Sequence, residues 1–148
     1  MMTKVFNTPF ENMLRILLLT SILNCPVNID RLAALDFMCI YGKKCKVLGK
    51  NLHGDNEFGF AEFANKREKI AEAIRLSVRN DFLKAEFTNQ GFAYSINERG
   101  REIVRGIQSP YARSYTVGAK IICRRFSSYT DRDLLKYISD RASESKEV

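Results

Sequence analysis

The stretch Asn65–Val104 constrains the fold more than any other part of the chain. It reads NKREKIAEAIRLSVRNDFLKAEFTNQGFAYSINERGREIV. The apolar spacing is helical up to Asn80-Asp81 and then alternates, which predicts a helix followed by two strands. Thr88–Gly91 is typical of a tight turn, in which Gly91 is free to adopt positive φ. Asn97 is suited to cap a second helix. The order helix, hairpin, helix is typical of the C-terminal part of a winged-helix domain.

Capping residues predict further helices on both sides of this stretch. Thr8-Pro9 and Asn28 start two helices before it, and Ser109-Pro110 and Thr130 start two helices after it. The first helix is apolar almost all round, so it lies at the centre of the domain or in a subunit interface. The predicted fold is therefore α+β and mainly α, a winged helix-turn-helix with a two-stranded wing and additional C-terminal helices.

We expect a single domain overall, because the chain has 148 residues. Residues 1–108 form the winged-helix core, and residues 109–148 form a helical extension that packs on it. The apolar segment Met13–Leu23 is too short to span a membrane and is interrupted by Arg15. It also lacks a small-x-small cleavage site, so a buried helix is favoured over a signal peptide. No membrane span and a cytoplasmic location are expected.

The sequence lacks the patterns that enzymes and metal sites use. It has one histidine, His53, and four cysteines without a C-x-x-C pair, which argues against zinc and favours reduced thiols. Phosphate-binding and nucleophile-elbow motifs are absent. Asp36, in the middle of the second helix, is expected to be solvated or salt-bridged and not catalytic. We therefore expect no enzyme activity, no catalytic or metal-binding residue and no cofactor.

A net charge of +7 suggests nucleic acid as a partner, although a solvated basic surface or an acidic protein partner would explain it equally well. In a helix-turn-helix protein the second helix of the pair enters the major groove, here Asn65–Arg79. Four lysines also gather in a long loop over residues 42–59, where they could hold phosphates. Three glutamates, Glu62, Glu68 and Glu72, and a hairpin turn without lysine or arginine argue against sequence-specific binding. The candidate DNA contacts are Lys43, Lys44, Lys46, Lys66, Arg67, Arg75 and Arg79.

Four segments together resemble a known family. They are NTPFENMLRILLLTSIL, NIDRLAALDFMCIYG, GFAYSINERGREIV and SPYARSYTVGAKIICRRF, which span roughly residues 5–140. The chain resembles the middle component of bacterial ABC-three-component conflict systems, and within these the small accessory subunit of Lamassu-type defence. The basic loop is not part of the resemblance, so no family role is carried onto it.

The resemblance implies a non-catalytic subunit of an antiphage or anti-plasmid complex. Its partners would be an SMC-like coiled-coil ATPase and an effector, often a nuclease, which it would bridge or stabilise. The chain would contact DNA as part of the assembled complex. Aromatic and arginine side chains suit such an interface, although ordinary helix packing explains them equally well. The candidate interface residues are Phe10, Met13, Leu17, Tyr111, Arg113 and Tyr115.

The alternative is a free-standing, dimeric winged-helix transcriptional regulator. A regulator binds duplex DNA alone, with an affinity that falls steeply as salt rises. An accessory subunit binds DNA poorly alone and depends on its partner to cover an apolar interface.

Overall fold

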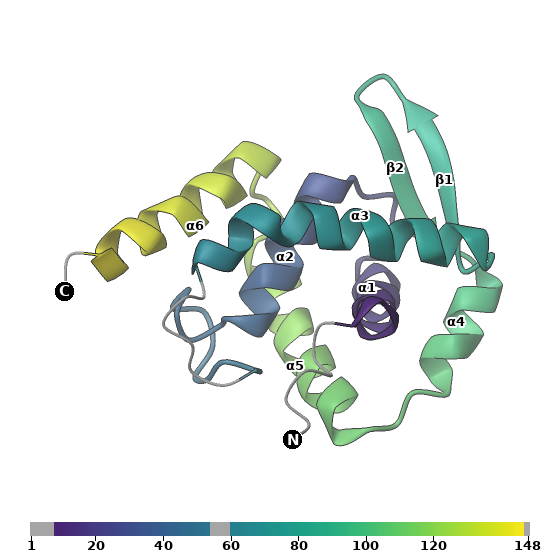
Figure 1. The fold of residues 1–148 in the computed structure, drawn as a ribbon, viewed down its shortest axis with the longest axis horizontal. Helices are drawn as coiled ribbons and strands as arrows, with labels where there is room; N and C mark the ends of the chain where they lie inside the picture. Colours follow the sequence, from purple (N-terminus) through teal and green to yellow (C-terminus); the bar gives the residue numbers. More distant parts are fainter. Residues whose placement is uncertain (1–7, 54–59, 147–148) are drawn as a thin grey trace.

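The computed structural model describes residues 8–53 and 60–146. Within these residues the fold is α+β and mainly helical, with one antiparallel sheet of two strands, as the sequence predicts (Figure 1). Two further helices follow the helix that comes directly after the hairpin, which confirms the prediction of additional C-terminal helices. The elements in chain order are α1 (Pro9–Leu23), α2 (Ile29–Ile40), the 3-10 turn η2 (Phe60–Glu62), α3 (Phe63–Arg79), β1 (Leu83–Thr88), β2 (Gly91–Ile96), α4 (Glu98–Arg105), α5 (Pro110–Arg125) and α6 (Asp131–Lys146).

Helix α1 lies at the centre of the molecule. It contacts α2, α3, α4, α5 and β2, and Figure 1 shows it nearly end-on with α3, α4 and α5 around it. Of the two predicted locations for this helix, the structure selects the domain centre. Met13 is 4% exposed and Leu17 is 0% exposed. The structure therefore corrects the prediction that these two side chains meet a partner, because the chain's own helices already cover them.

The predicted capping residues set the starts of five helices, including α6, where the Thr130 hydroxyl accepts a hydrogen bond from the Asp133 amide at 3.1 Å. The Thr8 hydroxyl accepts a hydrogen bond from the Glu11 amide at 3.1 Å, and the side chains of Asn28, Asn97 and Ser109 cap α2, α4 and α5 in the same way. These bonds satisfy amide groups that have no partner inside the helix. The local sequence therefore fixes where these helices begin.

The N-cap of helix α3 lies three residues earlier than predicted. Asn65 lies inside the helix instead of capping it, and the N-cap position is Glu62, without a side-chain hydrogen bond. The ring of Phe63 packs on Phe37 of α2 with a centroid distance of 4.9 Å. This aromatic contact holds the first turn in place, so packing replaces a polar cap.

The hairpin stands on the helices through its base. Leu83 pairs with Ile96 there, and both are buried. Between α1 and α2, Val27 forms an isolated bridge with Tyr94, through backbone bonds of 2.9 and 2.8 Å. The turn residue Gly91 has φ of 105°, as predicted for a position that favours glycine. The hairpin is thus fixed at one end and free at the other.

The last two helices pack on the first two. Helix α5 contacts α1 and α2, and α6 contacts α2. The Tyr137 hydroxyl of α6 donates a hydrogen bond to the Cys45 carbonyl at 2.8 Å, which ties α6 to the loop after α2. Residues 54–59, at the end of the predicted basic loop, lie outside the described residues. Over the ranges that are described, no helix has both the length and the apolarity to cross a membrane.

Candidate functional site

Four helices meet at one buried carboxylate, Asp36 of α2. Arg15 of α1 donates two hydrogen bonds to it, at 3.1 and 3.2 Å, and the Tyr115 hydroxyl of α5 donates a third at 2.7 Å. Lys66 of α3 places its ammonium 3.3 Å from the same carboxylate. We call Arg15, Asp36, Lys66 and Tyr115 the buried charge cluster. Of the two predictions for Asp36, the salt-bridged one is confirmed.

The cluster is sealed from water. The side chains of Arg15 and Asp36 are 1% and 0% exposed, and that of Lys66 is 7% exposed. The Arg15 guanidinium also donates a hydrogen bond to the side-chain oxygen of Asn12 at 2.8 Å. Charged groups are buried in proteins only when they are paired and hydrogen-bonded in this way.

Charge balance explains the pKa values inside the cluster. Burial acts to raise the pKa of Asp36, but the attraction of Arg15 and Lys66 and its hydrogen bonds hold that pKa well below its ordinary value. Burial acts to lower the pKa of Arg15, and Asp36 more than compensates. For Lys66, burial prevails and its pKa falls, with repulsion from Arg15 adding to the effect. One carboxylate therefore serves two cations, and Lys66 is the less stabilised of them.

A histidine and a tyrosine extend the cluster toward the surface. The His53 ring nitrogen Nε2 lies 2.6 Å from the Tyr111 hydroxyl, and the two rings stack at 5.6 Å. The Tyr111 hydroxyl also accepts a bond from Arg15 at 3.4 Å. Burial, with the charge of Arg15, lowers the pKa of His53 to about 4, so this imidazole is neutral at neutral pH. Over residues 8–53 and 60–146 no group of three or more metal-ligating side chains is found.

The geometry of the cluster suits structure better than catalysis. Asp36 is fully enclosed and bonded on both oxygens, so it has neither access to a substrate nor a free lone pair directed at one. What it does is join α1, α2, α3 and α5 at one point. The sequence signal for it lies in Arg15 and Asp36, each a charged residue within an apolar run of its helix.

The predicted partner residues separate into exposed and buried ones. Phe10 is 60% exposed and Arg113 is exposed, whereas Tyr115 is 1% exposed and belongs to the buried charge cluster. The structure thus corrects the prediction for Tyr115, because its hydroxyl is bonded to Asp36 inside the protein. Sequence reasoning missed Val117 and Ile121, which are 62% and 43% exposed on α5. Their spacing of four places them on the same face as Arg113.

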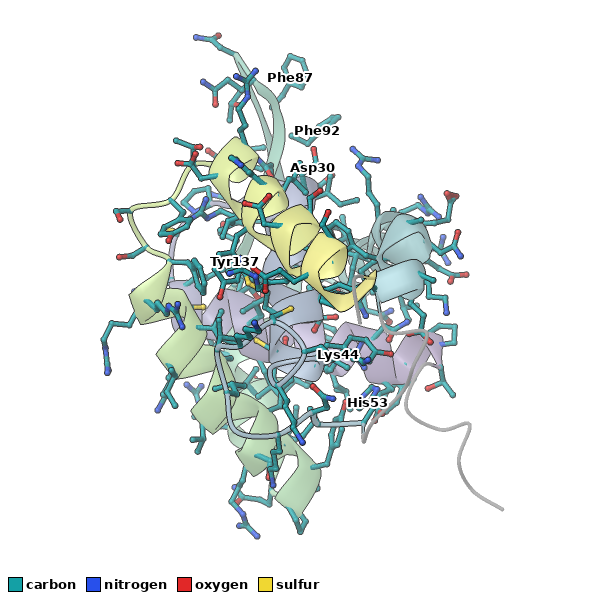
Figure 2. The ribbon with its side chains drawn as sticks, turned by 90° about the vertical axis from the view of Figure 1, so that its left-hand side faces the viewer. Asp30, Lys44, His53, Phe87, Phe92 and Tyr137 are labelled. Carbon is teal, nitrogen blue, oxygen red and sulfur yellow. The ribbon has the colours of Figure 1, made fainter. Side chains whose placement is uncertain are left out.

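The predicted DNA contacts do not form one surface. Lys66 is buried, which corrects its prediction as an exposed contact, and Arg67 is exposed but forms an ion pair with Asp30 at 2.7 Å. Arg75 and Arg79 lie on the outer side of the C-terminal half of α3. Lys43, Lys44 and Lys46 belong to the loop at the opposite end of the molecule, where Lys46 pairs with Glu144 at 2.9 Å (Figures 1 and 2).

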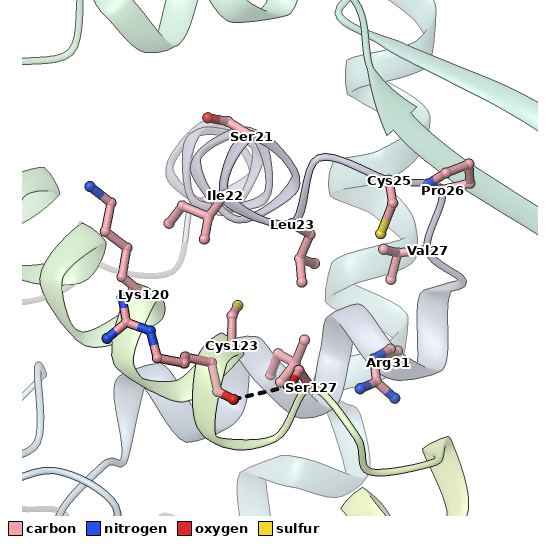
Figure 3. Close-up of a pocket in the computed structure, with 12 residues that line it drawn as sticks. Ser21, Ile22, Leu23, Cys25, Pro26, Val27, Arg31, Lys120, Cys123 and Ser127 are labelled. Atoms are coloured by element: carbon pink, nitrogen blue, oxygen red, sulfur yellow. Dashed lines mark hydrogen bonds between the residues drawn. The ribbon is translucent and has the colours of Figure 1, made fainter.

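A cavity of about 720 Å³ lies between the end of α1, the turn that follows it, α2 and α5 (Figure 3). Cys25 and Cys123 line it together with Lys120 and Arg124, and no carboxylate is among its lining residues. Burial raises the pKa of Cys123 to about 11, so this thiol stays protonated at neutral pH. A protonated thiol is a poor nucleophile, and the lining offers no base to activate it.

The chain matches one family model over nearly all of its length. The model for ABC-three component (ABC-3C) system Middle Component 2 covers residues 5–147. No curated protein and no solved structure matches the chain.

Proposed function

Because the chain belongs to the family of ABC-three component system Middle Component 2, we propose that it is a non-catalytic accessory subunit of a multi-subunit defence complex. The family match over residues 5–147 is the observation that carries this proposal. Middle components work with partner subunits. We propose that the partners are an SMC-like coiled-coil ATPase and an effector nuclease, as in Lamassu-type systems, and that this chain bridges them in the cytoplasm.

We further propose that residues 1–108 are a winged-helix core and that residues 109–148 are an extension packed on it. The order of α1, α2, α3 and the hairpin supports this assignment. So does the isolated bridge of Val27 to Tyr94, since it pairs the segment between the first two helices with β2. The connection from α2 to α3 is much longer than a simple helical turn and sets this chain apart from a minimal helix-turn-helix.

The described residues offer support for a role without catalysis. The buried charge cluster is closed, and Cys123, one of the two thiols that line the cavity between α1 and α5, is held protonated. The cluster instead gives the four helices that it joins a fixed arrangement. A rigid body that presents surfaces on several sides is what a bridging subunit needs.

The exposed face of α5 is our candidate for one of the two partner contacts. Val117 and Ile121 are large apolar side chains in water, and Arg113 continues their line toward the start of the helix. Phe10, at the start of α1, is a separate exposed aromatic side chain. Phenylalanine and arginine are enriched in protein interfaces, and Val117 and Ile121 add apolar area beside Arg113.

Contact with DNA is proposed for the assembled complex and not for this chain alone. Lys43 and Lys44 at one end of the molecule and Arg75 and Arg79 at the other are solvent-accessible to different degrees and lie apart. Scattered cations add to a binding surface that partner subunits complete, whereas an independent DNA-binding domain concentrates them on one face.

The test is to tag this chain in its native operon, purify it at moderate salt and determine the mass and composition of what elutes. A stable complex with a large coiled-coil ATPase supports the accessory role. A homodimer that shifts duplex DNA on its own, with affinity falling steeply between low and physiological salt, would refute it and support the regulator instead.

A further inference from the structure

The two faces of the hairpin differ in chemistry. One face carries the cross-strand pairs Leu83 with Ile96, Ala85 with Tyr94, and Phe87 with Phe92. The first pair is buried, whereas Phe87 is 76% and Phe92 is 54% exposed. Figure 2 shows these two rings on the hairpin beyond the helices. The apolar face therefore continues from the core into solvent.

A groove forms where this face meets the C-terminal half of α3. It has a volume of about 350 Å³. Ile74 and Val78 supply its helical wall, and Ala85, Tyr94 and Phe92 supply its wall on the hairpin. Val78 is itself 38% exposed. The ring of Phe92, which lines the groove, meets the ring of Phe87 edge to face at 5.2 Å.

Two arginines provide the only charges in the lining of the groove. Arg75 and Arg79 are one helical turn apart, and both are exposed. Two other exposed arginines, Arg67 and Arg105, are paired with Asp30 and Glu98. In the part of the chain that the structure describes, neither groove arginine has a carboxylate within ion-pair distance. The groove thus has an apolar floor and an uncompensated cationic rim.

We propose that this groove binds a short amphipathic segment of a partner protein, with large apolar side chains flanked by aspartate or glutamate. Apolar side chains would fill the space between α3 and the hairpin, and carboxylates would pair with Arg75 and Arg79. This occupant rests on the proposed function, in that the partner is another component of the same complex. The charge of the rim selects acidic flanks, and the two exposed phenylalanine rings provide an anchor of the kind that dominates binding.

Nucleic acid fits the same groove less well. The turn at the hairpin tip carries no lysine or arginine. The charged residues of the strands, Lys84 and Glu86, lie on the face opposite to Phe87 because side chains alternate along a strand. A DNA backbone lying across the groove would therefore set phosphates against two phenylalanine rings.

The experiment is co-purification of the tagged full-length chain with the other components of its operon, comparing two double variants with the wild type. The first double variant, Phe87→Ser/Phe92→Ser, removes the two exposed aromatic rings. The second, Arg75→Glu/Arg79→Glu, reverses the charge at the rim and leaves the apolar side chains of the groove unchanged. Matched controls on α6 are Leu135→Ser, at 43% exposed, and Arg132→Glu, also exposed. Thermal melting of each variant confirms that it is folded.

We expect each double variant to lower the captured amount of one component at least tenfold, while both controls retain it. A photo-crosslinking amino acid in place of Phe87 should then attach to an apolar, acidic segment of that component. If the wild-type complex forms and both double variants retain it, the groove assignment is refuted and the accessory role stands. If the variants lose only the binding of duplex DNA, the groove is a nucleic-acid surface and the assignment is equally refuted. If the wild-type chain captures no component, both proposals fail.

Discussion

Replacing Asp36 with asparagine should destabilise this protein far more than any surface change of the same kind. The substitution keeps the shape of the side chain but removes the one negative charge between Arg15 and Lys66, whose side chains are 1% and 7% exposed. Two cations would then be buried without a counter-ion. Removing one partner of a buried ion pair costs about 3–5 kcal/mol of unfolding free energy. For a chain of this size that corresponds to a fall in Tm of roughly 6–20 °C.

The assay is urea unfolding at neutral pH, followed by circular dichroism, with Tm measured in parallel. Asp140→Asn is the matched control, because it breaks an exposed ion pair. The side chain of Asp140 is 50% exposed and that of its partner Lys136 is 72% exposed. That change should cost less than about 1 kcal/mol. Tyr115→Phe removes a single hydrogen bond to the Asp36 carboxylate and should cost about 1.5–3 kcal/mol, which keeps the series informative if the first variant does not fold.

The result that would refute the reasoning is a small effect of Asp36→Asn. If its unfolding free energy lies within about 1 kcal/mol of the wild type, like that of a surface pair, the buried charge cluster does not hold the helices together. An effect of Tyr115→Phe as large as that of Asp36→Asn would also contradict it, because the lost charge and not the lost hydrogen bond should dominate.

Three further outcomes are expected. Lys66→Met should leave stability nearly unchanged or raise it, as measured by the same urea unfolding, because burial lowers the pKa of Lys66 and the Arg15–Asp36 pair remains intact. The single histidine, His53, should titrate with a pKa of about 4 when its ring protons are followed by NMR, and a value near the ordinary 6.5 would contradict its burial. Because the unfolded chain takes up this proton below pH 6.5 and the folded protein only near pH 4, His53 should make stability fall as the pH drops through that window. Gly100→Ala should lower Tm, because a Cβ there would collide with the carbonyl oxygen of Phe82, whereas Gly106→Ala, with no heavy atom closer than 3.6 Å, should not.

The buried charge cluster also bears on how the protein presents its surfaces. It joins α1, α2, α3 and α5, so the exposed stripe of α5 and the groove beside α3 are parts of one arrangement. A variant that weakens the cluster would therefore disturb both candidate partner surfaces at once. Tests of either surface are best made with substitutions at exposed positions only.

The sequence by itself determined the local structure. Short polar side chains fixed the starts of α1, α2, α4 and α5, because a helix start needs an acceptor for its first amides wherever it lies in the protein. Alternating apolar residues fixed the strands of the hairpin, and Gly91 fixed its turn. These are interactions between near neighbours in the chain. Asn65 was misassigned as a cap for the same reason: the start of α3 depends on the contact of Phe63 with Phe37, which no local pattern records.

Only the tertiary structure decided which charged and apolar residues are covered. Lys66 reads as one more cation on an amphipathic helix, yet it is buried because α3 lies over Asp36, thirty positions earlier in the chain. Phe87 and Phe92 read as the apolar face of a strand, yet they stay in water because the hairpin extends past the helices that cover its base. Periodicity tells which side chains share a face, whereas burial depends on what the rest of the chain places against that face.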